Sequence, residues 1–170
     1  SLVSMFKGKG PSGFGYGSSA EDVTAGLDLG GQTILLTGCN SGIGKETLRV
    51  LALRGAHVIA AARTEEKARA ACADVGGETT PVACELSEPS SVRACAARVK
   101  ELGRPLNAII CNAGIMALPK LTLEQGYELQ FFTNHMGHFI LVTSLLDQLA
   151  DGGRVVMLSS AAHTGAPREG

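Results

Sequence analysis

Short apolar runs alternate along the chain with longer segments of helical periodicity. The apolar runs are TILLT (33–37), HVIAAA (57–62), TPVAC (80–84), NAIIC (107–111) and RVVMLS (154–159). Because these runs are apolar throughout, we expect strands that are buried on both faces. The segments between them are long enough for crossover helices, which place successive strands parallel to one another. The pattern therefore predicts a doubly wound α/β fold of the Rossmann type.

Glycines and capping residues set the expected limits of the helices. The first crossover helix is expected over 42–54, with Gly55 as its stop, and SEPSSVRACAARVKEL forms a later one. After the fourth strand we expect a long helical stretch that Thr122 and Gln125 cap. The DGG sequence at 151–153 predicts a turn into the fifth strand.

The first 28 residues differ in composition from the rest. FKGKGPSGFGYGSS is rich in glycine and serine, which is typical of an irregular arm. In SSAEDVTAG, Ser18 and Glu21 predict a capping box for a short helix that Gly26 would end. We therefore divide the chain into an N-terminal arm, residues 1–28, and one α/β domain, residues 29–170.

Charge and hydropathy exclude several classes of partner. The chain has 15 basic and 16 acidic residues and no basic cluster, so neither nucleic acid nor an anionic membrane surface is expected. No apolar run approaches the roughly 20 residues that a membrane span needs. Five cysteines without a CxxC pair favour reduced thiols and a cytoplasmic protein. His135 and His138 lie three residues apart without a third ligand nearby, so no metal site is predicted.

The sequence TGCNSGIGKE joins the first strand to the first helix. Gly38 can make the sharp turn, Gly42 can let backbone approach a ligand, and Gly44 can let the helix pack close to the strand. The loop is therefore predicted to hold a pyrophosphate at the helix N-terminus. A glycine-rich turn without a ligand is the alternative, which this position in a βαβ unit disfavours. A P-loop is excluded because Lys45 is followed by Glu46.

Arg63 follows the second strand, where a dinucleotide site contacts the adenosine ribose. A carboxylate at this position suits the 2′-hydroxyl of NAD, whereas an arginine suits the 2′-phosphate of NADP. Glu65 and Glu66 come two and three residues later, where favourable charge at a helix N-terminus explains them. We therefore predict NADP as the cofactor, with NAD as the alternative.

Four motifs in order resemble the short-chain dehydrogenase/reductase family. They are TG(x)3GIG after the first strand, CNAG at the fourth, the asparagine in TNHMGHF, and the serine pair that ends the fifth strand. The resemblance covers residues 29–170. The arm resembles the branch that contains retinol-dehydrogenase-like proteins, WW-domain oxidoreductase and the short-chain dehydrogenase of the chloroplast inner-envelope translocon.

The resemblance implies a set of cofactor-binding residues. Those that would border the phosphates are Thr37, Gly38, Ser41, Ile43 and Gly44. Arg63 would hold the 2′-phosphate, and Glu85 and Leu86 would flank the adenine, although the family usually has aspartate where Glu85 stands. The segment beside the cofactor would be Asn112, Ala113 and Gly114, preceded by Cys111 where many members have asparagine.

Two residues are expected to be catalytic. Carbonyl reduction by hydride places negative charge on oxygen, so a hydrogen-bond donor and a proton source must face that atom. By resemblance, Ser160 would bond the substrate oxygen and Asn134 would help to hold a water-linked proton path. The family takes the proton from a YxxxK segment, but Tyr16 and Tyr127 are not followed by lysine at the fourth position.

We therefore expect the 170 residues to be a truncated dehydrogenase, interrupted after the fifth strand and inactive alone. A further helix with YxxxK, another strand and substrate-binding segments are expected after Gly170. The expected function is NADP-dependent hydride transfer on a small, fairly apolar alcohol or carbonyl, with homo-oligomers allowed. The alternative is a catalytically inactive NADPH-binding regulatory or scaffold protein.

Overall fold

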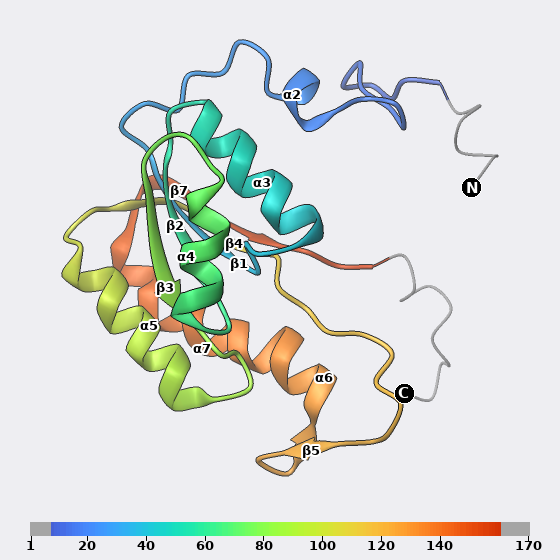
Figure 1. Cartoon of the computed structure of the whole chain (residues 1–170), viewed down its shortest axis with the longest axis vertical. Helices are drawn as coiled ribbons and strands as arrows, with labels where there is room; N and C mark the ends of the chain where they lie inside the picture. The colour runs from blue at the N-terminus through green and yellow to red at the C-terminus, as the bar shows by residue number, and fades with distance from the viewer. Residues whose placement is uncertain (1–7, 161–170) are drawn as a thin grey trace.

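The computed structural model describes residues 8–160, and it confirms the predicted fold class. Five parallel strands form one sheet between two layers of helices (Figure 1). The strands are β1 (Thr33–Thr37), β2 (His57–Ala62), β3 (Thr79–Ala83), β4 (Leu106–Cys111) and β7 (Leu149–Met157). Their order is β3-β2-β1-β4-β7, as in a Rossmann sheet. The winding direction reverses between β1 and β4, where ligands bind in sheets of this kind.

Helices cover both faces of the sheet. They are α3 (Gly42–Leu53) and α4 (Glu65–Ala73) on one face, and α5 (Pro89–Glu101) and α7 (Gly137–Leu145) on the other. Because side chains alternate along a strand, Leu36 and Val58 pack toward the first pair and Leu35 and Ile59 toward the second. All four are fully buried, so the prediction of strands covered on both faces holds for β1 and β2. Within residues 8–160 no helix is long and apolar enough to cross a membrane.

The arm contains one short helix, α2 (Ala20–Val23), whose capping box differs from the predicted one. Ser19 and Asp22 form the box: the Asp22 N–H donates to the Ser19 hydroxyl at 3.1 Å, and the Ser19 N–H donates to the Asp22 carboxylate at 2.8 Å. The predicted pair, Ser18 and Glu21, is therefore wrong by one residue. Glu21 instead accepts a hydrogen bond from Arg49 of α3, which ties the arm to the domain.

The segment after β4 also differs from the prediction. A hairpin of β5 (Leu123–Glu124) and β6 (Tyr127–Glu128) precedes a continuous helical stretch of α6 (Leu129–Phe131), the π-helix η1 (Phe132–Met136) and α7. Thr122 and Gln125 do not cap a helix, because Gln125 and Gly126 have positive φ angles and form the hairpin turn. The cap is Glu128, whose carboxylate accepts two backbone N–H groups of the first turn.

The strand β7 begins earlier than the predicted RVVMLS run. It follows the short 3₁₀-helix η2 (Leu146–Gln148), and its first pairing joins Leu149 to Leu106. The next pairing joins Arg154 to Ala108, so the expected DGG turn lies inside the strand as an irregularity. Gly152 has φ +76°, which lets the backbone take this bulge.

The two edges of the described sheet are different. At β3, the Glu78 carbonyl accepts a hydrogen bond from β2 and the Cys84 N–H donates one to β2. The backbone N–H and C=O groups of the even-numbered residues of β3 therefore point toward β2, and those of the odd-numbered residues point away from the sheet. Pro81 therefore faces outward, where it removes one edge N–H group. At the β7 edge, Val155 to Leu158 are 37 to 49% exposed. In the described part of the chain, no strand pairs with the outer side of β7.

Candidate active site

The loop between β1 and α3 is closely packed at two of its glycines. Gly38 has φ +71°, and a Cβ there would come within 2.8 Å of the Ala113 Cα atom. A Cβ on Gly44 would overlap the carbonyl oxygen of Gly38, so α3 can approach β1 only without a side chain. Gly42 has φ +53°, but the space where its Cβ would lie is open. The loop thus leaves the N-terminus of α3 accessible.

A cleft of about 440 Å³ lies at the carboxyl ends of the strands. It brings together eleven of the twelve residues that the sequence predicts to bind the cofactor, namely Thr37, Gly38, Ser41, Ile43, Gly44, Arg63, Glu85, Leu86, Asn112, Ala113 and Gly114. The twelfth, Gly42, is exposed in the same glycine loop. These residues come from four separate segments, so the fold joins them into one surface.

The cleft has further lining residues that are not among the predicted ones. They are Asn40, Ala62, Lys67, Cys84, Ile115, Thr133 and Leu158. Lys67 could have been predicted from the sequence. It lies in the first turn of the helix after Arg63, so it adds a second positive charge at the carboxyl end of β2. The others follow only from how the strand ends assemble.

Arg63 and Glu85 form an ion pair in the cleft, with 3.0 Å between Nε and Oε2. The other carboxylate oxygen of Glu85 accepts from the Ser87 hydroxyl at 2.9 Å and from the Ser87 N–H at 3.2 Å. The Arg63 side chain is 59% exposed, whereas that of Glu85 is 25% exposed. Glu85 is therefore held by its own loop and contacts Arg63 from a fixed position.

Asn112 joins the ends of β1 and β4. Its side-chain Nδ2 donates to the Thr37 carbonyl at 2.9 Å and to the Gly38 carbonyl at 3.3 Å. The Thr37 hydroxyl oxygen accepts the N–H groups of Asn112 and Ala113, each at 3.0 Å. These bonds hold the glycine loop and the Asn112–Gly114 segment, the two sides of the cleft, at a fixed separation.

Asn134 lies in the π-helix and braces the segment after β4. Its Oδ1 accepts from the Ile115 N–H and its Nδ2 donates to the Ile115 carbonyl, both at 2.8 Å. The side chain is thus turned toward the cleft wall. Such wide helical turns are frequent at functional sites.

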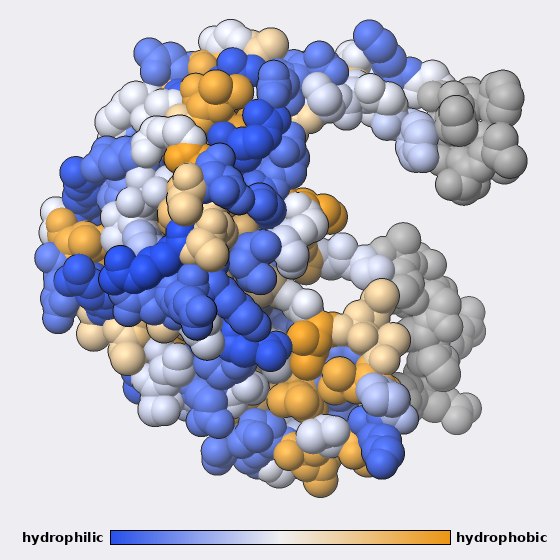
Figure 2. All heavy atoms as spheres, in the orientation of Figure 1, coloured by the Kyte–Doolittle hydropathy of each residue, from blue (hydrophilic) through white to orange (hydrophobic). Residues whose placement is uncertain are grey.

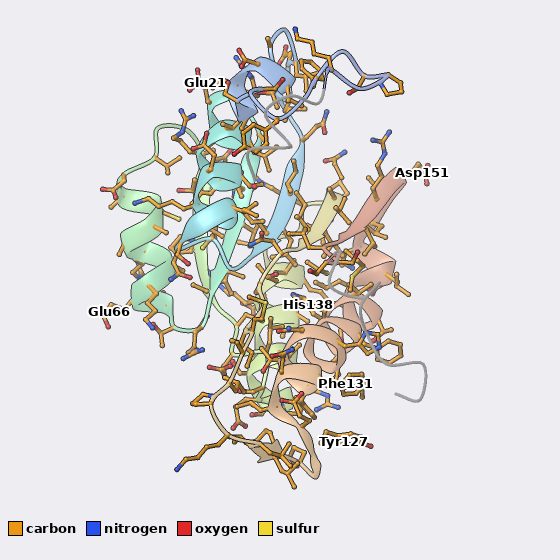
Figure 3. All side chains as sticks on the ribbon, turned by 90° about the vertical axis from the view of Figure 1, so that its right-hand side faces the viewer. Glu21, Glu66, Tyr127, Phe131, His138 and Asp151 are labelled. Atoms are coloured by element: carbon orange, nitrogen blue, oxygen red, sulfur yellow. The ribbon has the colours of Figure 1, made fainter. Side chains whose placement is uncertain are left out.

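The two helical histidines have different surroundings. His135 is exposed and stacks on Phe131, with 5.3 Å between ring centroids. His138 lies in the interior (Figure 3), and its Nε2 is 2.8 Å from the Thr37 hydroxyl oxygen. His138 is not among the predicted site residues, although its position four residues after Asn134, one helical turn on, is a local signal for contact with that turn. Among residues 8–160 no group of three or more potential ligands is arranged to hold a metal ion.

Ser160, the second predicted catalytic residue, is exposed beyond β7, two residues after Leu158 of the cleft. It therefore lies at the same end of the sheet as the glycine loop, where the strands have their carboxyl ends. Residues 161–170, which include the rest of the predicted loop, lie outside the described residues.

Three buried cysteines, Cys39, Cys84 and Cys111, are unsuited to nucleophilic chemistry. All five are free, and only Cys72 is not fully buried. Burial raises the pKa of Cys39 and that of Cys111 to about 12. The contact with Cys95 and burial also raise the pKa of Cys84, which lines the cleft. Because the thiolate is the reactive form, the buried Cys39, Cys84 and Cys111 are inert at neutral pH.

Apolar side chains gather near the hairpin, beside the segment that leaves the cleft (Figure 2). Met116 is 79% exposed, Leu121 78%, Leu123 60% and Phe131 48%. Met116 directly follows Ile115, which lines the cleft. Exposed apolar groups of this size mark interaction or ligand-binding surfaces more often than ordinary protein surface.

Comparisons with known proteins agree with this geometry. A family model described as short chain dehydrogenase matches residues 32–168. The chain is 42% identical to short-chain dehydrogenase TIC 32 B, chloroplastic, of Brassica napus, across 99% of this chain and 57% of that protein. It is 42% identical to human retinol dehydrogenase 13 (78% and 42%) and 38% identical to zebrafish (Danio rerio) WW domain-containing oxidoreductase (90% and 39%).

Solved structures give the same result. The crystal structure of an uncharacterized protein from Mycobacterium Paratuberculosis has a TM-score of 0.73 and 41% identity, covering 81% of this chain and 49% of that one. The citronellol catabolism dehydrogenase of Pseudomonas aeruginosa PAO1 has a TM-score of 0.70 and 31% identity, covering 83% and 61%. The chain thus spans about half the length of the relatives that it matches.

Proposed function

The chain belongs to the short-chain dehydrogenase family, and from that premise we propose that the whole protein is an NADP-dependent oxidoreductase. It would transfer a hydride between the nicotinamide and an alcohol or carbonyl of a small, fairly apolar substrate. The observation that carries this proposal is the cleft at the carboxyl ends of the strands, where the glycine loop meets Arg63 and Asn112.

The residues present fit a dinucleotide. Gly38 and Gly44 leave no room for a Cβ, so backbone N–H groups at the start of α3 can face a pyrophosphate. Arg63 and Lys67 line the cleft where the adenosine ribose would lie, which supports the 2′-phosphate of NADP. Glu85 and Leu86 would flank the adenine.

When bound, the nicotinamide supplies or accepts the hydride. Ser160 would donate a hydrogen bond to the substrate oxygen, where negative charge develops during reduction. Asn134, which fixes the Ile115 backbone, would keep the wall of the cleft in place beside the reacting groups and help to hold the water-linked proton path. The exposed apolar side chains Met116 and Leu121 favour a fairly apolar substrate.

The proton donor of the family, the tyrosine of YxxxK, is not among the 170 residues. Tyr16 and Tyr127 are followed four residues later by Ala20 and Phe131, so neither makes the YxxxK pair. We expect the 170-residue chain to bind NADPH without turnover. The second candidate function is a catalytically inactive NADPH-binding regulatory protein, which the same cleft would serve.

The free cysteines support a reducing compartment such as the cytoplasm. A relative with 42% identity is chloroplastic by name, and that organelle is the competing location. Subcellular fractionation with an antibody to the 170-residue chain separates the two.

Calorimetric titration of the 170-residue chain with NADPH and NADH tests the cofactor. Tighter binding of NADPH supports the proposal, and absence of dinucleotide binding contradicts it. Assays of carbonyl reduction by the full-length protein, with Ser160→Ala as the matched variant, then separate the two functions. Turnover that falls in the variant indicates an enzyme, whereas NADPH binding without turnover across alcohol and carbonyl panels indicates a regulator.

A further inference from the structure

His138 is a buried titratable residue to which the proposed chemistry gives no role. Its side chain is 1% exposed, yet both ring nitrogens have polar partners. Nε2 lies 2.8 Å from the Thr37 hydroxyl oxygen, and Nδ1 lies 2.9 Å from the backbone carbonyl oxygen of Asn134. The imidazole therefore connects the end of β1 to the turn that carries Asn134.

The partners determine where the protons lie. A carbonyl oxygen can only accept, so the proton of the ring must be on Nδ1, where it is donated to Asn134. The Thr37 oxygen already accepts the N–H groups of Asn112 and Ala113, which occupy both of its lone pairs. Thr37 must then donate its own proton, and it has two acceptors within reach. Nε2 of His138 lies at 2.8 Å and the Ile110 carbonyl oxygen at 3.4 Å, so the shorter bond goes to the unprotonated Nε2.

The neutral ring is also the form that its surroundings favour. Burial lowers the pKa of His138 below its ordinary value, and the charge of nearby His135 acts in the same direction. The bond to the Asn134 carbonyl has the opposite, smaller effect. A charged ring would need a third acceptor position on the Thr37 oxygen, which that atom does not have.

This arrangement lies behind the cleft. Thr37 lines the cleft at the end of β1, and the Asn134 side chain holds Ile115, another lining residue, through two hydrogen bonds. At this point the helix makes a wider turn, because the Gly137 N–H bonds to the Phe132 carbonyl five residues earlier. Within that turn, Nδ1 of His138 forms a hydrogen bond to the Asn134 carbonyl oxygen.

We propose that His138, as the neutral Nδ1–H tautomer, is a positioning residue that fixes Thr37 and the Asn134 turn relative to one another. The glycine loop and the Asn134 turn are thereby held in one relative position on opposite sides of the cleft. The consequence for cofactor affinity rests on the proposed dinucleotide-binding function, whereas the tautomer does not.

Two substitutions separate the two hydrogen bonds. In His138→Asn the amide nitrogen can replace Nδ1 and donate to the Asn134 carbonyl, but Thr37 loses its nearer acceptor and keeps only the Ile110 carbonyl oxygen at 3.4 Å. In His138→Gln the amide oxygen can replace Nε2 and accept from Thr37, but the Asn134 carbonyl loses its donor. We expect His138→Asn to weaken NADPH binding about tenfold and His138→Gln to stay within about threefold of the unmodified chain.

A purely structural role would act through stability, so thermal unfolding midpoints of both variants are measured with the calorimetric affinities. In a Thr37→Val background, which lacks the hydroxyl, His138→Asn should cause no further loss of affinity. His135→Gln, at an exposed position on the same helical stretch, is the matched control and should bind NADPH normally. If both His138 variants weaken NADPH binding equally, in proportion to their loss of stability, the positioning role is overturned.

Nitrogen-15 NMR of the 170-residue chain without NADPH tests the tautomer and requires no variant to fold. We expect a protonated Nδ1 and an unprotonated Nε2 for His138 at neutral pH. A protonated Nε2, alone or in a charged ring, would overturn the proposal. If the expected tautomer is found but NADPH does not bind, the proposed dinucleotide function fails and the arrangement of His138 stands.

Discussion

The carboxylate of Glu85 contacts the Nε atom of Arg63 at 3.0 Å, while Ser87 holds the other oxygen of the same carboxylate. Arg63 is therefore approached from its side, and within residues 8–160 no further polar contact of its guanidinium is found. The two terminal nitrogens are geometrically suited to a bidentate contact with a phosphate.

Replacing Arg63 should change cofactor preference. A charge-assisted hydrogen bond is worth about 1.5 to 3 kcal/mol, and the exposure of Arg63 favours the low end. We expect Arg63→Ala to weaken NADPH binding about tenfold and to leave NADH binding nearly unchanged, as measured by calorimetry. Arg69→Ala, which removes an exposed arginine that pairs with Glu65, is the control. Equal affinities for the two cofactors in the unmodified chain would sink the assignment of NADP.

Replacing Glu85 should have the opposite effect. Its negative charge offsets the attraction between Arg63 and the 2′-phosphate, so Glu85→Gln should tighten NADPH binding by a few-fold, with little change for NADH. Glu65→Gln removes the same charge two residues from Arg63, at a side chain that pairs with Arg69 instead. If the Glu65 variant tightens NADPH binding as much, the effect is one of net charge and not of the Arg63 contact.

Two glycines of the same loop should respond differently to substitution. Gly42→Val meets open space and costs the strain of a positive φ, about 1 to 2 kcal/mol, so the chain should stay folded. NADPH binding should nevertheless be lost, because the branched side chain would stand where backbone approaches the pyrophosphate. Gly44→Ala should lower the free energy of unfolding more than Gly42→Val, because its Cβ would overlap the Gly38 carbonyl.

Urea unfolding of these two variants measures the difference directly, and calorimetry reports NADPH binding. Unchanged affinity in a folded Gly42→Val chain would mean that the loop is only a turn. A Gly44→Ala chain as stable as the unmodified one would contradict the close contact between α3 and β1.

Stability should fall in mild acid because of His138. Burial lowers its pKa in the folded chain, so below about pH 6.5 the unfolded chain takes up a proton that the folded chain does not. The free energy of unfolding should therefore decrease as the pH falls through this range, by at most about 1.4 kcal/mol per pH unit for one proton. His138→Gln should reduce that dependence.

Urea unfolding between pH 7.5 and 5 provides the measurement. Burial also lowers the pKa of His57, so part of the dependence should persist in the His138 variant. His135→Gln, at the exposed stacked ring, should keep the full dependence. An unchanged slope in His138→Gln would show that the ring binds its proton equally well in the folded and unfolded chains, which contradicts a pKa lowered by burial.

The sheet and the glycine loop could be predicted because their signals are local. Continuous apolar runs such as HVIAAA match β2 residue for residue, and Gly38 has the positive φ angle that a sharp turn requires. Most of the candidate cofactor residues share one cleft because, in a parallel sheet, the loops after the strands all meet at one end.

The errors arose where several residues offered equivalent local chemistry. Ser18 and Ser19 are both suitable helix caps. The contact of Glu21 with Arg49 of α3 is consistent with Ser19 as the cap, because Glu21 is then free of the capping box. The hairpin after β4 depends on the positive φ angle of Gln125, which residue type alone does not indicate. The bond between His138 and Thr37 joins positions 101 residues apart, beyond the reach of any local pattern, whereas only the bond to Asn134 lies within one helical turn.

The outward-facing Pro81 makes the two sides of the sheet unequal as templates for another chain. At the β3 edge, a strand from another chain would lack one N–H partner because Pro81 has none, which discourages strand addition. On the β7 side, no strand within residues 8–160 pairs with the outer backbone, which is flanked by Val155 and Met157, both partly exposed. Concentrated preparations of the 170-residue chain should therefore self-associate through β7, and Val155→Lys should suppress this association.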